Sequence, residues 1–155
     1  MRRFSSLTIR ATVAGAALLL CAAHAEAAQC SVSVSSVNFG TYDVFATSHN
    51  DSTGTVTITC NGGAKNIDIS ISRGASSTFF PRQMLKGTEQ LQYNLYLDAA
   101  RTAVWGDGSA GTQMGDVRNP VNNQDETLTV FGRIPALQDV SAGSYSDSVT
   151  VTVNY

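Results

Sequence analysis

Two cysteines thirty positions apart have the clearest chemical potential in this chain. Cys30 and Cys60 are an even pair, and in an oxidising compartment such a pair most simply forms a disulfide. In the chain-entropy model, closing a loop of about 30 residues contributes roughly 3–4 kcal/mol. The bridge would join the first strand to the second. A metal site is a poorer interpretation, because there is no CxxC motif and His49 is the single histidine beyond the N-terminal segment.

His49 is also the only candidate base for a serine hydrolase in the same part of the chain. It lies in the polar segment 47–52, which is typical of a loop, and no GxSxG motif is present to hold a nucleophile. Pairs of carboxylates offer no better alternative. Asp125 and Glu126 are adjacent and would point to opposite faces of a strand. The sequence therefore does not predict an enzyme.

Asp98 and Asp107 form a second possible carboxylate pair, but both have ordinary roles at a strand end and in a glycine-flanked turn. Asp107 and Asp116 match no calcium-binding loop. Trp105 precedes Gly106-Asp107-Gly108, so Trp105 and Asp107 form a possible ligand loop in which a sugar ring stacks on the indole. The competing interpretation, which we favour, places Trp105 over the core. No cofactor is predicted.

The N-terminal segment predicts the compartment. Three arginines precede an apolar run over residues 11–23, and Ala25-Glu26-Ala27 offers a cleavage site before Ala28, so residues 1–27 are expected to form a secretory signal peptide. The run is too short to span a membrane stably. Cys21 follows Leu20, whereas lipoprotein acylation sites normally have a small residue directly before the cysteine. Lipidation is therefore not expected.

The remaining chain, residues 28–155, has the size of one domain with its own core. Without the three N-terminal arginines and Glu26, its formal net charge is −4. This balance provides no basic surface for nucleic acid or anionic lipid. No other segment is long and apolar enough to cross a membrane, so the protein is expected to be secreted and not membrane-spanning.

Apolar and polar residues alternate along most of this domain, which is the pattern of half-buried antiparallel strands. Only 14% of the residues are charged, while serine and threonine are abundant on the polar positions. Residues 76–86 could hold a helical turn, and residues 106–124 are the least regular segment, expected as a surface loop or loose hairpin. We predict an all-β sandwich of six or seven antiparallel strands. Strands are expected around residues 30–39, 56–60, 67–71, 91–97, 103–105, 128–134 and 145–155.

The last strand poses a specific problem. Val149, Val151, Val153 and Tyr155 fall on one face, and no residue follows Tyr155 to form a neighbouring strand. An unpaired strand edge beside an apolar face invites another chain to add on. A strand from a different polypeptide is therefore a candidate partner for this edge.

The residue order of the whole domain resembles the spore coat protein U domain family, which includes secreted pilins of the archaic chaperone-usher pathway. The resemblance rests on six spaced patterns: Cys30-x-Val32, Phe39-Gly40-x-Tyr42-Asp43, Val56-x-Ile58-x-Cys60, Tyr93-x-Leu95-Tyr96-x-Asp98, Phe131-Gly132-x-Ile134 and Gly143-x-Tyr145-x-Asp147-x-Val149-x-Val151-x-Val153-x-Tyr155.

The resemblance implies an immunoglobulin-like sandwich that lacks its final strand. A periplasmic chaperone would fill the open groove first, and a neighbouring pilus subunit would fill it after delivery through an outer-membrane usher. It also implies a periplasmic stage followed by a place on the cell surface, with roles in attachment and biofilm formation. Tyr155 would either set the register of the incoming strand or cap the core. We expect the partner-strand groove to be lined by Val32, Val34, Val149, Val151, Val153 and Tyr155.

One feature departs from the pattern of polymerising pilins. Those subunits carry a donor strand before the first cysteine, whereas the predicted cleavage leaves about two residues ahead of Cys30. A subunit of this kind could accept a strand but not donate one, which suits a fibre tip, a chain terminator or a coat component. The alternative function is a stand-alone secreted coat or carbohydrate-binding domain.

Overall fold

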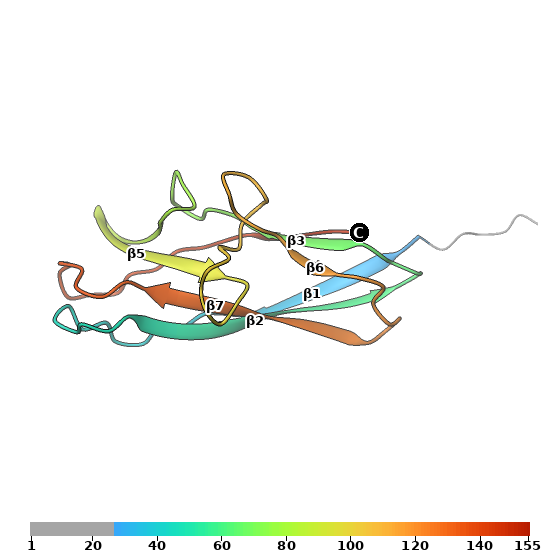
Figure 1. The fold of residues 1–155 in the computed structure, drawn as a ribbon, viewed down its shortest axis with the longest axis horizontal. Coiled ribbons are helices and arrows are strands. Elements are labelled where there is room, and N and C mark those ends of the chain that lie inside the picture. Colours follow the sequence, from blue (N-terminus) through green and yellow to red (C-terminus); the bar gives the residue numbers. More distant parts are fainter. Residues whose placement is uncertain (1–26) are drawn as a thin grey trace, which may run out of the picture.

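Alternating apolar and hydroxyl-bearing residues form eight strands in the computed structural model, which describes residues 27–155 (Figure 1). The predicted signal peptide lies outside these residues, except for Ala27. The strands are β1 (Gln29–Ser35), β2 (Asn50–Asn61), β3 (Ile67–Ile71), β4 (Arg82–Lys86), β5 (Glu89–Tyr96), β6 (Gly115–Val117), β7 (Asp125–Ile134) and β8 (Val151–Asn154).

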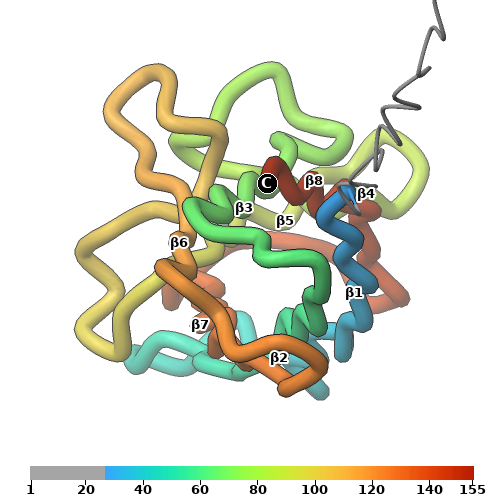
Figure 2. The backbone as a smooth tube through the Cα atoms, turned by 90° about the vertical axis from the view of Figure 1, so that its right-hand side faces the viewer, coloured from blue at the N-terminus to red at the C-terminus, as the bar shows by residue number. Residues whose placement is uncertain are grey.

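The strands form two antiparallel sheets that pack as an immunoglobulin-like sandwich. One sheet has five strands in the order β1-β2-β7-β5-β4, and the other has three in the order β6-β3-β8. Seen along the long axis, the strands surround a common interior (Figure 2). The predicted all-β, immunoglobulin-like fold class is confirmed.

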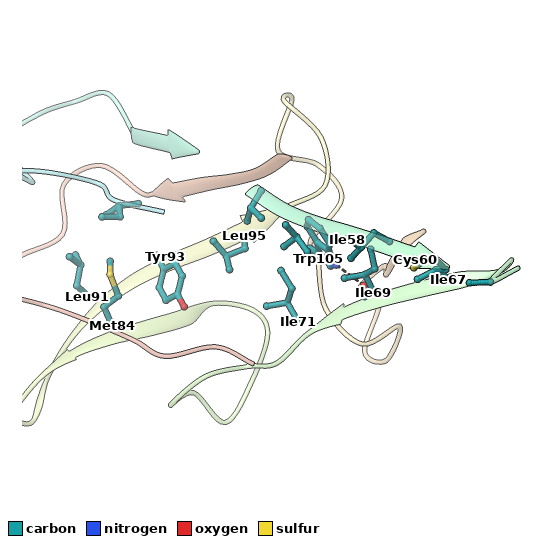
Figure 3. Packing of buried hydrophobic residues seen from close by; sticks show 14 residues of the cluster. Ile58, Cys60, Ile67, Ile69, Ile71, Met84, Leu91, Tyr93, Leu95 and Trp105 are labelled. Atoms are coloured by element: carbon teal, nitrogen blue, oxygen red, sulfur yellow. Dashed lines mark hydrogen bonds between the residues drawn. The ribbon is translucent and has the colours of Figure 1, made fainter. Parts of the chain in front are cut away.

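The core lies between the inward faces of the two sheets (Figure 3). Val56 and Ile58 of β2 face Ile67, Ile69 and Ile71 of β3, and all five are at most 1% exposed. This burial is the main stabilising contribution, because each such side chain contributes about 1.5–3 kcal/mol when it leaves water.

Trp105 lies in the centre of this core and is fully buried. Its indole Nε1 donates a hydrogen bond of 2.8 Å to the carbonyl of Ile69, so the one polar atom of the ring has a partner. The ring passes directly over Gly115, where a Cβ atom would collide with it. The interpretation of Trp105 as a core residue is confirmed, and a buried ring leaves no face on which a sugar could stack.

The predicted disulfide is present. Cys30 and Cys60 are direct partners in the β1–β2 ladder and are bonded, with Cα atoms 4.1 Å apart. The bond attaches β1, an edge strand that pairs with β2, to the side of the sandwich. Loss of either cysteine would leave β1 held by its ladder and side-chain contacts.

The outward face of β1, β2 and β7 carries rows of hydroxyl groups. Ser35, Thr55 and Thr129 lie side by side in register, and Ser33, Thr57 and Thr127 form the next row. Hydroxyls of neighbouring strands are close enough to hydrogen bond, at 2.9 Å for Ser35–Thr55 and 3.0 Å for Thr57–Thr127. These exposed rows are the polar half of the alternation seen in the sequence.

Three local predictions were wrong. The helical turn expected within residues 76–86 is absent, and residues 82–86 form strand β4, paired with β5. The expected strand 103–105 is not formed, because Val104 and Trp105 take part only in isolated bridges. The stretch 106–124 is mostly irregular, as expected, and contains the short strand β6. The strand at the C-terminus is also shorter than expected, because β8 begins at Val151.

Strand β4 was missed because its inward positions include a charged residue. Arg82 is fully buried and lies over the ring of Phe79, 5.0 Å from its centroid. Its guanidinium donates to Asn94 Oδ1 at 2.7 Å and to the Trp105 carbonyl at 2.6 Å. Two further bonds reach the carbonyls of Ser72 and Ile71. Burial lowers the pKa of this guanidinium, and the neutral acceptors compensate for its desolvation.

We expect Arg82→Met to destabilise the fold by about 3 kcal/mol, because the acceptors left in the core would lose their donor. Equilibrium unfolding in guanidinium chloride, followed by the fluorescence of Trp105, measures this loss of stability. Arg118→Met is the matched control, since Arg118 is exposed and pairs with Asp68 and Asp116 at the surface. The control should change stability by less than about 1 kcal/mol. Equal losses in the two variants would contradict the assigned role of Arg82.

Candidate functional site: an open groove between two edge strands

Four of the described strands lie at sheet edges and have one neighbour each, namely β1 and β4 in the five-stranded sheet and β6 and β8 in the three-stranded sheet. Within residues 27–155, β1 pairs with β2 alone, and β8 pairs with β3 alone. The end-on view places β1 and β8 on the same side of the molecule (Figure 2). One side of the sandwich is therefore bordered by two unpaired edges, one from each sheet.

A cavity of about 310 Å³ lies between these edges. Its β1 side is formed by Val34 and by residues 35–37, and its opposite side by Asp147, Ser148, Val149 and Val151. The floor consists of core side chains from both sheets, namely Phe39, Val56, Ile71, Met84, Tyr93, Leu95 and Val130. We call this cavity and its two borders the edge groove.

The β1 border is exposed although it faces inward. Val32 and Val34 pair with the buried residues Ile58 and Val56, which places them on the inward face of the sheet. They are nevertheless 43% and 62% exposed. Inward-facing valines remain this accessible because none of the described strands covers them from the side.

The opposite border is formed by the segment that ends in β8. Val149, Val151 and Val153 pack partly against the core, while Thr150 and Thr152 point outward and are exposed. The segment is attached at both ends: Ser146 exchanges two backbone hydrogen bonds with Leu85 of β4, and β8 pairs with β3. Tyr155 is 57% exposed, so its ring does not cap the core.

The two borders run in opposite directions. The start of β1 and the C-terminus lie at the same end of the molecule, so β1 leads away from that end and β8 leads toward it (Figure 1). A strand inserted between them would therefore be parallel to one border and antiparallel to the other. Sheets form both parallel and antiparallel backbone ladders.

The groove border is attached to β4 and β5 by a cluster around Glu89. Its carboxylate accepts hydrogen bonds from Ser141 and from the Tyr145 hydroxyl and pairs with Lys86 at 3.3 Å. These donors lower the pKa of Glu89 to about 2, with the bond from Ser141 as the largest cause. The cluster holds Tyr145, two residues before Asp147, at the end of the groove.

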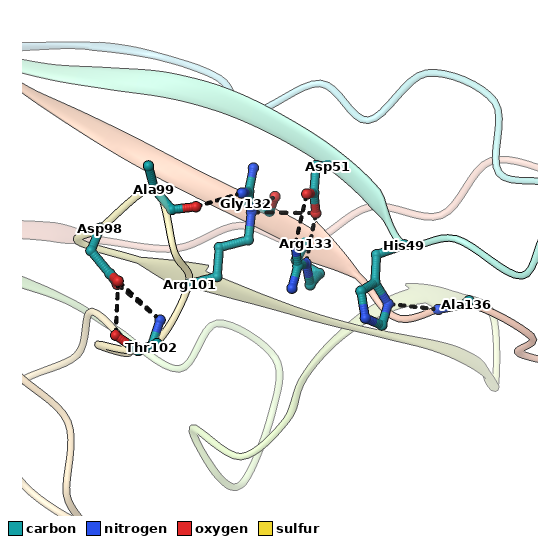
Figure 4. Close-up of polar contacts among 9 residues, drawn as sticks. All are labelled: His49, Asp51, Asp98, Ala99, Arg101, Thr102, Gly132, Arg133 and Ala136. Atoms are coloured by element: carbon teal, nitrogen blue, oxygen red, sulfur yellow. Dashed lines mark hydrogen bonds and ion pairs between the residues drawn. The ribbon is translucent and has the colours of Figure 1, made fainter.

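The remaining chemical candidates are not among the residues that line the groove. Figure 4 shows the polar contacts of His49 and Asp98. His49 accepts a hydrogen bond from the backbone N–H of Ala136 through Nδ1, at 3.2 Å. Nearby, Asp51 accepts two bonds from Arg133, at 2.7 and 2.8 Å, and these bonds are the main cause of its lowered pKa. In this arrangement His49 supports a loop rather than activating a nucleophile.

The carboxylates considered for catalysis have local structural roles. Asp98 accepts from the backbone of Thr102 and Ala103, and the Ala103 bond is the largest cause of its lowered pKa. Asp107 accepts from Ser109, which likewise lowers its pKa. Asp125 accepts from Thr59 at 2.6 Å. The lowered pKa values of Asp98 and Asp107 oppose the role of a general acid at neutral pH.

Metal ligands and membrane-spanning helices are absent from the described part of the chain. Across residues 27–155, no three side chains of histidine, cysteine, aspartate or glutamate are arranged to hold a metal ion. No helix in that same range is long and apolar enough to cross a membrane.

Similarity to known proteins agrees with this geometry. The sequence model of the Spore Coat Protein U domain matches residues 16–152, which is most of the chain. The chain belongs to the Spore Coat Protein U domain family. The match begins within the predicted signal peptide and reaches into β8.

Two similar proteins extend this result. Protein U of Myxococcus xanthus is 28% identical over 133 residues, which cover 77% of this chain and 71% of that protein. A chain in the crystal structure of the CsuC–CsuE chaperone–tip adhesion subunit pre-assembly complex from the archaic chaperone-usher Csu pili of Acinetobacter baumannii has the same fold, with a TM-score of 0.59 and 22% identity. The match covers 83% of this Spore Coat Protein U domain chain and 40% of the matched chain.

The structure brings together several of the residues that the sequence assigned to the groove. Val34, Val149 and Val151 line the cavity, whereas Val32, Val153 and Tyr155 lie on its borders outside it. Asp147 and the floor residues were not predicted. The floor combines side chains from strands far apart in the sequence, but Asp147 continues the alternation of the three valines and could have been found from that pattern.

The Glu89 cluster predicts a specific dependence of stability on pH. The pKa of Glu89 is lower in the folded protein than in the unfolded chain. The stabilisation of the fold by the ionised Glu89 carboxylate is therefore complete above about pH 4.5 and is lost as the pH falls toward 2. Glu89→Gln should therefore flatten the decline in the unfolding midpoint between these pH values. Glu126→Gln is the control and should retain the steeper decline. Parallel curves for Glu89→Gln and the parent chain would contradict the stabilising role of the Glu89 carboxylate.

Proposed function

We propose that this protein is a structural subunit of a secreted surface fibre or coat, and that a β-strand from another polypeptide completes its sandwich. The edge groove is the observation that carries this proposal. It combines an apolar floor with two unpaired backbone edges, which is the requirement for strand addition.

The energetic argument rests on what the groove leaves exposed. An inserted strand would cover the inward faces of Val32, Val34 and Val151 and supply hydrogen-bonding partners to both edges. Each large apolar side chain moved out of water contributes about 1.5–3 kcal/mol. A chain without this strand should therefore be aggregation-prone.

The comparisons support the class of partner. The family and the shared fold with a chain of a chaperone–subunit complex favour a periplasmic chaperone, neighbouring pilus subunits and an outer-membrane usher as partners. The protein would pass through the periplasm to the cell surface or a pilus, where attachment or biofilm formation would follow. A tip or terminating position depends on the predicted cleavage before Ala28, which the structure does not test, and stays a prediction.

A secreted coat protein is the second candidate, favoured by the similarity to Protein U and by the family name. In that case the chain would function as a stand-alone domain. The two functions differ in one observable, since a self-complete domain should be a soluble monomer with one reversible unfolding transition. The carbohydrate-binding version receives no support from Trp105, which is buried.

We expect the chain refolded alone, with its disulfide intact, to aggregate, and a peptide of about ten residues with alternating apolar side chains to restore a monomeric complex. Val151→Glu should abolish rescue, because it places a charge on the groove side of the border. Thr152→Glu is the matched control on the outward face of the same strand and should be rescued normally. Size-exclusion chromatography with light scattering measures the outcome. A stable monomer without any peptide would refute strand acceptance.

A further inference from the structure

The inward stripe of the C-terminal segment contains one charged residue. Asp147, Val149, Val151 and Val153 alternate along one face, and Asp147 lines the edge groove together with the first two valines. A carboxylate in this stripe is unexpected, because a strand inserted into the groove would exclude water from it.

The carboxylate is held in place by three neutral donors. Its Oδ1 accepts from the backbone N–H groups of Ala75 at 2.9 Å and Ser148 at 2.8 Å. Its Oδ2 accepts from the hydroxyl of Tyr93, another groove residue, at 2.7 Å. Gly74 permits this approach, because a Cβ at that position would collide with the carboxylate.

The negative charge itself has no counter-ion in contact. Within residues 27–155, Asp147 takes part in none of the ion pairs, all of which involve other carboxylates. The buried Arg82 is attracted to it electrostatically, but its hydrogen bonds go to Asn94 and to backbone carbonyls. A carboxylate offers about four acceptor positions, and three are occupied, so Oδ2 can accept one more bond.

We propose that Asp147 makes the groove selective for a strand that places a lysine or arginine opposite it. This inference rests on the proposed function and specifies the chemistry of the partner. In the preferred strand, apolar side chains lie opposite Val149, Val151 and Val153. The lysine or arginine lies two positions away from the residue that faces Val149, so that it faces Asp147. An acidic residue at that position would bring two carboxylates together in a site closed to water.

The test uses peptides of about ten residues with alternating apolar side chains. In each peptide, the inward-facing residue that would lie opposite Asp147 is lysine, glutamine or glutamate. Because the direction of insertion is open, a first set carries this position near the C-terminus and a second set near the N-terminus. The chain is refolded with each peptide, and the dissociation constant is measured by competition with a fluorescent peptide.

In one set, the lysine peptide should bind about tenfold more tightly than the glutamate peptide, with glutamine between them. This difference should shrink in about 0.5 M salt, where charges are screened. Moving the same lysine and glutamate to an outward position of the peptide should make little difference to binding.

Variants of the chain provide the second measurement. Asp147→Asn should remove the preference for lysine, whereas Asp139→Asn, which removes an exposed carboxylate outside the groove, should retain it. If Asp147→Asn does not fold, the ranking of peptides on the unchanged chain still decides the question. Equal binding of all three peptides overturns the selectivity of Asp147 but leaves strand acceptance intact. Failure of every peptide to restore folding overturns strand acceptance itself.

Discussion

The missing hydrogen-bonding partner between β1 and β8 is the constraint on which the rest of the structure depends. A sandwich edge with unpaired backbone groups and inward valines is costly in water, and here two such edges face each other across one cavity. The chain does not cover this side with a loop of its own within the described residues. An added strand would therefore stabilise the fold and join the protein to its partner through the same contacts.

Several contacts keep the borders of the groove in place while it is empty. The disulfide holds β1 against β2, and the bonds between Ser146 and Leu85 fix the start of the opposite border. Arg82 joins β4, β5 and the segments around Trp105 through buried hydrogen bonds. A preformed groove reduces the entropy that an incoming strand must lose on binding.

The sequence predicted the fold class, the disulfide and the C-terminal strand with one open edge, because these follow from alternation and from the cysteine pair. It did not predict β4, since Arg82 occupies an inward position that normally holds an apolar residue. It also missed the groove floor, where Phe39, Met84 and Leu95 meet only after the strands are assembled. Trp105 beside Asp107 left two interpretations open, and burial decided between them.

The hydroxyl rows on β1, β2 and β7 have a consequence for the outside of the molecule. Ser33, Thr57 and Thr127 present groups that do not ionise in the biological range, so hydration of these rows does not depend on acidity. Neighbouring hydroxyls already bond to one another along the row. This flank of the protein should therefore stay wetted, and resist adhesion to copies of itself, in dilute acid and in brine alike.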